Sequence, residues 1–154
     1  MKIYLASDHA AFELKEAIKA YLLGKKIDIE DMGCHSPDAV NWAEYGAKAA
    51  GKVSQDPDNS RGIIVCGSGL GMSMVSNKFK NVRAALCHDE YTAEMSRKHN
   101  DANVLNMGAR VLSVEKALKI LETWLNTGFE GEKVPRYKER IDYLRDVVEN
   151  NNFK

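Results

Sequence analysis

The sequence predicts an α/β fold in which helices alternate with the strands of a five-stranded parallel sheet. Two observations predict this class. Five short apolar runs alternate with segments whose apolar residues recur at helical spacing, and such alternation is typical of βαβ units. The chain has 154 residues, 44% of them hydrophobic, which suits one domain with a substantial core. We therefore expect a single domain spanning residues 1–154.

Each of the five apolar runs is short enough to be a buried strand. These strands are expected at residues 2–6, 27–31, 62–65, 83–87 and 103–107. The first helix is predicted by a stripe at positions i, i+3, i+4, i+7 and i+8, which consists of Leu14, Ala17, Ile18, Tyr21 and Leu22, with Gly24 ending it. Further helices are expected over 43–53, from the glycine-rich loop to about 79, and over 91–98, 114–125 and 137–149.

Charge and cysteine content limit the classes of partner. Lys plus Arg equals Asp plus Glu at 22 each, so no basic field favours nucleic acid or an anionic membrane surface. No apolar run approaches the roughly 18 residues that span a bilayer. The three cysteines show no C-x-x-C spacing, which indicates neither a disulfide framework nor a zinc site. We expect a cytoplasmic protein with a small-molecule partner.

Polar side chains follow the predicted strands, where ligands bind in open parallel sheets. They are Ser7, Asp8 and His9 after the first strand, Cys66 to Ser73 after the third, His88 and Asp89 after the fourth, and Arg110 after the fifth. Asp8 could equally cap a helix, and His9 could be a surface imidazole. This edge of the sheet is therefore the expected place of the chemistry.

The stretch CGSGLGMS at residues 66–73 is the most specific of these segments. Gly67, Gly69 and Gly71 allow a backbone to approach an anion closely at a helix start. The spacing matches neither the dinucleotide fingerprint nor a P-loop, so a tight turn without a ligand is an equal alternative.

Cys66 lies at the predicted strand end beside this loop. Backbone amides there favour a thiolate, which is the environment of a reactive cysteine, although a buried structural cysteine is the commoner role for the residue type. Cys34 and Cys87 lack such a loop and are interpreted as structural. His99 stands at the end of a predicted helix, where a cation suits the helix dipole.

Thiol, imidazole, carboxylate and amide groups without metal-ligand spacing suggest proton transfer with a stabilised oxyanion. Acyl transfer and carbon-acid isomerisation both fit this set. The residue pattern does not choose between them.

Five segments of the chain resemble one known family. They are ASDHA (6–10), CGSGLGMS (66–73), NK (77–78), VRAAL (82–86) and RKHNDAN (97–103). In register over residues 1 to about 145, they resemble type B ribose-5-phosphate isomerase and its relatives that act on allose 6-phosphate and galactose 6-phosphate.

This resemblance implies a Rossmann-like three-layer α/β/α sandwich that forms a homodimer or a dimer of dimers, with each active site built from two subunits. The implied reaction belongs to the pentose phosphate pathway. It interconverts an aldose phosphate and a ketose phosphate through a cis-enediolate, without metal or cofactor.

The resemblance also implies residue roles. Cys66 matches the catalytic base of the cysteine branch, since the glutamate of the other branch would fall at Met72. Gly67, Gly69 and Gly71, with Ser68, match an oxyanion hole, and His99 matches the residue that opens the sugar ring. Asp8 and Asn100 match contacts to sugar oxygens, and His9 and Arg110 match contacts to the phosphate.

Two departures from the family pattern bear on the substrate. Before its last helix the family supplies two arginines to the phosphate, whereas Lys133 and Tyr137 occupy these places here, with Arg136 one position earlier. We expect Lys133 and Arg136 to contact the phosphate in their place, although a lysine lacks the bidentate fork of arginine. Trp42 replaces a tyrosine that borders the sugar site.

Three alternatives stay open. A hexose 6-phosphate isomerase is consistent with both departures. The glycine loop followed by Asp89 also resembles half of a dinucleotide-binding domain, which would make the chain a nucleotide-binding module without catalysis. The last glycine of the dinucleotide fingerprint is missing, however. The third alternative is a thiol hydrolase, but no motif in the sequence places His99 beside Cys66 as its base.

Overall fold

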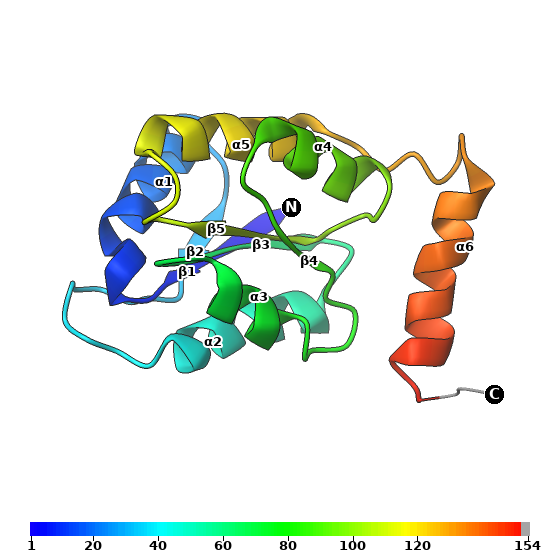
Figure 1. The fold of residues 1–154 in the computed structure, drawn as a ribbon, viewed down its shortest axis with the longest axis horizontal. Coiled ribbons are helices and arrows are strands. Elements are labelled where there is room, and N and C mark those ends of the chain that lie inside the picture. The colour runs from blue at the N-terminus through cyan, green and yellow to red at the C-terminus, as the bar shows by residue number, and fades with distance from the viewer. Residues whose placement is uncertain (152–154) are drawn as a thin grey trace.

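The computed structural model describes residues 1–151 and contains a parallel five-stranded sheet (Figure 1). The strands are β1 (Lys2–Ser7), β2 (Ile29–Asp31), β3 (Ser60–Cys66), β4 (Ala84–Leu86) and β5 (Val104–Gly108), in the order β2-β1-β3-β5-β4. All neighbouring pairs are parallel. The predicted sheet is confirmed, and its connections diverge between β1 and β3, which is where a ligand crevice is expected.

Helices cover both faces of this sheet (Figure 1). Helices α1 (Phe12–Gly24), α4 (Glu90–Lys98) and α5 (Val114–Asn126) pack on one face, and α2 (Trp42–Gln55) and α3 (Leu70–Ser76) pack on the other. Alternate residues of β3 divide between the two cores, with Ile63 and Val65 on the first face and Ile64 and Cys66 on the second. Cys66 is therefore fixed at the end of a strand that is buried on both faces.

Several element ends differ from those predicted. Helix α1 includes Gly24, and the positive φ of 59° falls on Lys26 beyond it. Helix α3 ends at Ser76, three residues before the predicted end. The edge strands β2 and β4 have only three residues each, because each has a partner strand on one side only.

The C-terminal segment stands apart from the sheet (Figure 1). It comprises α6 (Pro135–Tyr143) and the π-helical turn η2 (Leu144–Val148). The helix begins two residues before the predicted start because Pro135 is suited to a first helical turn. Neither element contains a buried residue. The end of this C-terminal segment is bound to the loop before β4, where the Asn81 N–H donates to both carboxylate oxygens of Glu149 at 3.0 Å each.

None of the helices in residues 1–151 combines the length and apolar character needed to cross a bilayer.

A buried ion cluster joins α1 to the end of β2. The Lys15 ammonium, completely buried, donates to Asp31 at 2.7 Å, and Lys19 donates to the same oxygen at 2.7 Å. The Gly33 N–H donates to the other oxygen at 3.0 Å. Burial alone would raise the pKa of Asp31, but these three donors hold it below its ordinary value of 3.8.

We predict that Asp31→Asn lowers the free energy of unfolding by roughly 2 kcal/mol at neutral pH, because the buried Lys15 ammonium keeps only its half-exposed partner Glu16. Since the pKa of Asp31 is lowered on folding, its contribution is present above the unfolded pKa and is lost as the pH falls through the folded value. Urea unfolding between pH 7 and pH 3 measures both effects. The control Glu30→Gln removes the half-exposed Lys2–Glu30 pair and should cost less than about 1 kcal/mol. Equal losses in the two variants would contradict the prediction.

Candidate active site

A cavity of about 350 Å³ opens at the carboxyl ends of β1 and β3. Of the residues predicted for the site, it brings together Asp8, His9, Cys66, Gly67, Ser68, Gly71 and Arg110. We call it the thiol cavity. It lies at the expected switch point because the β1–β3 register pairs Ser7 with Val65, which sets Asp8 and Cys66 at the neighbouring ends of these two strands. The Arg110 N–H donates to the Gly67 carbonyl at 2.9 Å, so the arginine follows the glycine loop closely.

Cys66 is held by the loop that follows it. Its side chain is buried, with 5% of the residue exposed, and its Sγ accepts the Gly69 N–H at 3.1 Å. Gly69 has a φ of +81°, and a Cβ there would lie 2.4 Å from the Leu86 Cδ1 and 3.0 Å from the Met107 carbonyl carbon. Glycine is therefore required for this amide to reach the sulphur. Gly69 itself does not line the cavity and serves it through this hydrogen bond.

Ser68 forms the exposed part of the loop. Its Oγ accepts the Leu70 N–H at 3.3 Å. A Cβ at Gly108 would lie 2.6 Å from the Ser68 carbonyl oxygen, so the end of β5 supports the loop by direct backbone contact. The loop therefore packs on the end of β5 and lies directly beside the Cys66 thiol.

Asp8 and His9 form the wall contributed by β1. The Asp8 Oδ1 accepts the Ala11 N–H at 3.1 Å and caps the 3-10 turn η1 (His9–Ala11), so the capping role weighed from sequence is present. The His9 Nδ1 accepts the Val40 N–H at 3.2 Å. Because Nδ1 accepts this hydrogen bond, Nε2 is the ring nitrogen that can carry the donor N–H. His9 can therefore donate one hydrogen bond to an anionic ligand.

Trp42 also lines the cavity; the order of strands and loops did not predict it, and the family resemblance alone placed this position beside a sugar site. It is the first residue of α2, which Asn41 caps by accepting the Ala43 N–H at 3.1 Å. A Cβ on Gly71 would lie 2.9 Å from the Trp42 ring, so the indole packs against the glycine loop.

The other four predicted residues lie elsewhere in the chain. His99 is the last-turn cap of α4, and its ring stacks on Tyr137 with centroids 4.5 Å apart. The Arg136 guanidinium lies 5.4 Å from the same Tyr137 centroid. Lys133 belongs to the turn before α6 and donates its N–H to the Glu130 carbonyl at 3.0 Å. We call His99, Asn100, Lys133, Arg136 and Tyr137 the His99 cluster.

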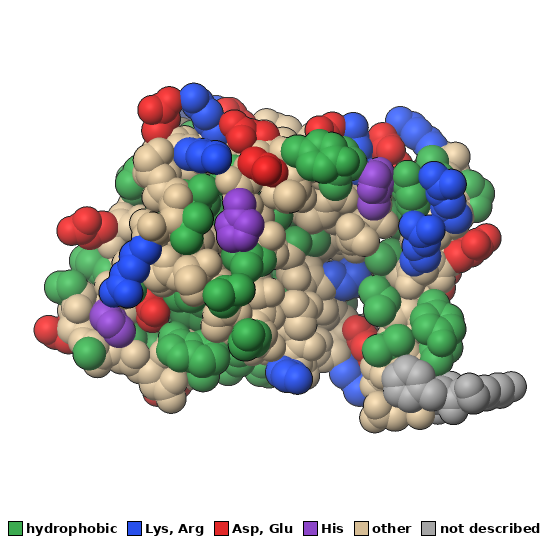
Figure 2. All heavy atoms as spheres, in the orientation of Figure 1, with side chains coloured by type: hydrophobic (Ala, Val, Ile, Leu, Met, Phe, Trp, Pro, Cys, Tyr) green, Lys and Arg blue, Asp and Glu red, His purple; other side chains and the backbone are tan. Residues whose placement is uncertain are grey.

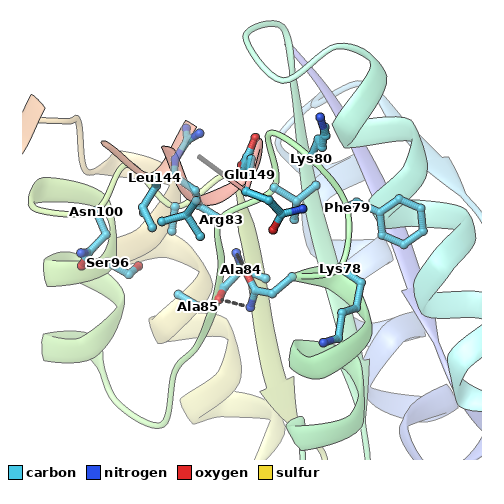
Figure 3. Close-up of a pocket in the computed structure, with 15 residues that line it drawn as sticks. Lys78, Phe79, Lys80, Arg83, Ala84, Ala85, Ser96, Asn100, Leu144 and Glu149 are labelled. Carbon is cyan, nitrogen blue, oxygen red and sulfur yellow. Dashed lines mark hydrogen bonds between the residues drawn. The ribbon is translucent and has the colours of Figure 1, made fainter. Parts of the chain in front are cut away.

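Asn100 borders a second hollow of about 770 Å³, between the C-terminal helix and the β4 edge. In Figure 3, Asn100 and Lys78 lie at opposite ends of this hollow, with Leu144 and Glu149 of the C-terminal segment above it. The space-filling view shows the molecule hollowed beside that segment, with hydrophobic and basic side chains around the opening (Figure 2). Among the described residues, none lines both this hollow and the thiol cavity.

Within residues 1–151, no group of three or more His, Cys, Asp or Glu side chains is arranged to hold a metal ion.

The other two cysteines occupy the interior. Cys34 and Cys87 are each 1% exposed. Burial raises the pKa of the Cys87 thiol, only partly offset by Ser96 and Thr92. Neither residue lines the thiol cavity.

We predict that iodoacetamide labels Cys66 at least about tenfold faster than Cys34 or Cys87, because only Cys66 borders a cavity that admits the reagent. Mass spectrometry of peptides after timed labelling of the native protein measures the three rates. Labelling of Cys87 at the rate of Cys66 would contradict this account of the cavity.

The family model and the solved structures that match this chain belong to the same family of sugar isomerases. The family model described as Ribose/Galactose Isomerase matches residues 3–144. The solved structure of Clostridium thermocellum ribose-5-phosphate isomerase B is 38% identical, with a TM-score of 0.92, and the match covers 98% of this chain and 99% of that one. The structure of Mycoplasma genitalium ribose-5-phosphate isomerase B with bound ribulose-5-phosphate is 35% identical, with a TM-score of 0.91, and the match covers 96% and 95%.

One relative is named for a different substrate. A 4-deoxy-4-sulfo-D-erythrose isomerase from Clostridium sp. (strain MSTE9) is 40% identical over 129 residues, which are 84% of this chain and 81% of the relative. Similar chains are therefore named for sugars of four and of five carbons.

Proposed function

Because the chain belongs to the ribose/galactose isomerase family and is thereby a sugar-phosphate isomerase, we propose that it interconverts ribose 5-phosphate and ribulose 5-phosphate. The observation that carries the proposal is the position of Cys66, whose sulphur accepts the Gly69 amide at the edge of a cavity that also holds His9 and Arg110. We further propose that residues 1–154 act as one catalytic domain.

In the proposed reaction, the Cys66 thiolate removes the proton from C2 of the open-chain aldose. The C2–H bond pair forms the C1–C2 double bond, and negative charge moves to O1, giving a cis-enediolate. The thiol then returns its proton to C1, while the O2 proton is lost and O1 is protonated, giving the ketose. Loop amides and Ser68 are placed to stabilise the developing oxyanion, where fixed dipoles lower the barrier most. No metal or cofactor takes part.

We propose that His9 and Arg110 bind the phosphate. The Nε2–H of His9 follows from its contact with Val40, and Arg110 supplies a positive charge to the same cavity. A ring N–H donor together with a guanidinium suits a phosphate dianion.

We propose that two chains complete each site in a homodimer, alone or as a dimer of dimers. The His99 cluster is separate from the thiol cavity of its own chain. The C-terminal helix buries none of its residues, and Leu70 and Met74 of α3 are 54% and 62% exposed. A two-fold pairing that covers these surfaces would bring the His99 cluster of one chain to the thiol cavity of the other.

The proposed setting is the cytoplasm, which is reducing. The three cysteines are free thiols in the described structure, and such thiols persist where disulfides are rare.

The test is the rate of ribulose 5-phosphate formation from ribose 5-phosphate by metal-stripped protein, compared with the rates on allose 6-phosphate and galactose 6-phosphate. We expect the highest kcat/KM for the pentose, since Trp42 packs on Gly71 and narrows the cavity. A higher kcat/KM for allose 6-phosphate or galactose 6-phosphate would contradict the ribose 5-phosphate assignment and favour the hexose 6-phosphate isomerase. Binding of NAD or ATP without isomerase activity would favour the nucleotide-binding module.

A further inference from the structure

We propose that Tyr137 is a positioning residue for the His99 imidazole during the opening of the sugar ring. This inference rests on the proposed function, in which His99 opens the ring. It starts from the contact between the two rings, whose centroids are 4.5 Å apart with planes inclined at 37°. The two residues are distant in sequence, one at the end of α4 and the other in the first turn of α6.

Little else orients the imidazole. The backbone of His99 is fixed by its N–H, which donates to the Met95 carbonyl at 2.9 Å. Within residues 1–151, however, no hydrogen bond reaches either nitrogen of its ring, and the stack on Tyr137 is its side-chain contact. The ring nitrogens are therefore available to a ligand, while the phenol lies against the imidazole and restricts its tilt.

Tyr137 is itself well placed to fix a ring. Its N–H donates to the Val134 carbonyl at 2.9 Å, and the Glu130 N–H donates to the Lys98 carbonyl at 3.1 Å, which ties the turn before α6 to the end of α4. The Arg136 guanidinium lies 5.4 Å from the Tyr137 centroid and restrains the phenol further. The contact thus joins two helix ends that the backbone already holds together.

Ring opening depends on this orientation. In ribofuranose 5-phosphate the C1 hydroxyl must lose a proton, the C1–O4 bond must break, and O4 must gain a proton. One imidazole can accept the first proton and deliver the second only if its nitrogens face O1 and O4 correctly. Exchange of the C1 hydrogen of ribulose 5-phosphate with solvent requires the enediolate but no ring step, because O5 carries the phosphate and the ketose has no five-membered ring to open.

The experiment compares wild type with Tyr137→Ala, Tyr137→Phe and the control Tyr91→Ala, a change on the helix that ends at His99, at a residue that is 69% exposed. Two rates are measured by NMR in heavy water, namely isomerisation of ribose 5-phosphate and deuterium exchange at C1 of ribulose 5-phosphate. We expect Tyr137→Ala to lower kcat/KM for ribose 5-phosphate about tenfold or more and to leave exchange within about twofold. Tyr137→Phe and Tyr91→Ala should match wild type.

The NMR chemical shifts of the His99 ring protons report on the contact with Tyr137 independently of catalysis. The His99 ring protons should be shifted upfield by the phenol in wild type and in Tyr137→Phe, and this shift should disappear in Tyr137→Ala. Unchanged isomerisation in Tyr137→Ala, or equal loss of isomerisation and exchange, would overturn the positioning role. Wild-type protein that neither isomerises the pentose nor exchanges the ketose would instead overturn the proposed function, and the role of Tyr137 with it.

Discussion

Replacing Cys66 with alanine should lower kcat for the ribose 5-phosphate reaction by roughly 10²–10⁴-fold, the usual contribution of a general base. The sulphur is the group at the edge of the thiol cavity that can accept the C2 proton in the proposed reaction. KM should change little, because the residues proposed to bind the phosphate are untouched. Steady-state kinetics with wild type and variant measured side by side test this.

The matched control is Cys87→Ala, which removes a thiol that is also buried but borders the core rather than the cavity. Its activity should stay within about twofold of wild type if it remains folded, although the loss of core packing should cost on the order of 1 kcal/mol in stability. Activity of Cys66→Ala within tenfold of wild type would refute the thiol mechanism.

The second large effect is expected for Gly69→Ala. A φ of +81° is unfavourable for alanine, and its Cβ would lie 3.0 Å from the Met107 carbonyl carbon, which cannot move without disturbing β5. The loop must shift, and the Gly69 N–H then leaves the Cys66 sulphur. We expect a loss of stability of about 1–3 kcal/mol and a fall in kcat on the order of 10²-fold, because the sulphur loses its amide donor and the neighbouring loop amides move from the place of the oxyanion.

Gly128→Ala is the control for this change, since a Cβ at Gly128 meets no atom within 4 Å. Urea unfolding and kcat/KM should both be close to wild type for the control. A Gly69→Ala protein with wild-type kcat would show that the strained turn has no part in the reaction.

The main features of the fold follow from patterns in the sequence. The five strands could be predicted because short apolar runs such as 62–65 are buried on both faces of the sheet. Helix ends were less predictable. Gly24 ends the apolar stripe, yet Lys26 adopts the left-handed conformation, because the exact end of a helix depends on local hydrogen bonding as well as residue type.

The site could be predicted in part. The position of a residue directly after a strand places it at the carboxyl edge of the sheet, and this reasoning found Asp8, His9, Cys66 and Arg110. It could not find Trp42, which reaches the cavity from the start of a helix on one face. Nor could spacing show that His99 points toward α6, since that depends on where a separate helix packs.

The most direct test of the account is complementation between two inactive variants, Cys66→Ala and His99→Ala, mixed in equal amounts, unfolded and refolded together. If each site takes Cys66 from one chain and His99 from its partner, random pairing makes about half of the dimers mixed, each with one intact site, so about a quarter of wild-type activity should return. If both residues of a site came from the same chain, mixed dimers would contain no intact site. No recovery above the separate variants, with folded dimers present, would contradict the proposed two-chain isomerase site.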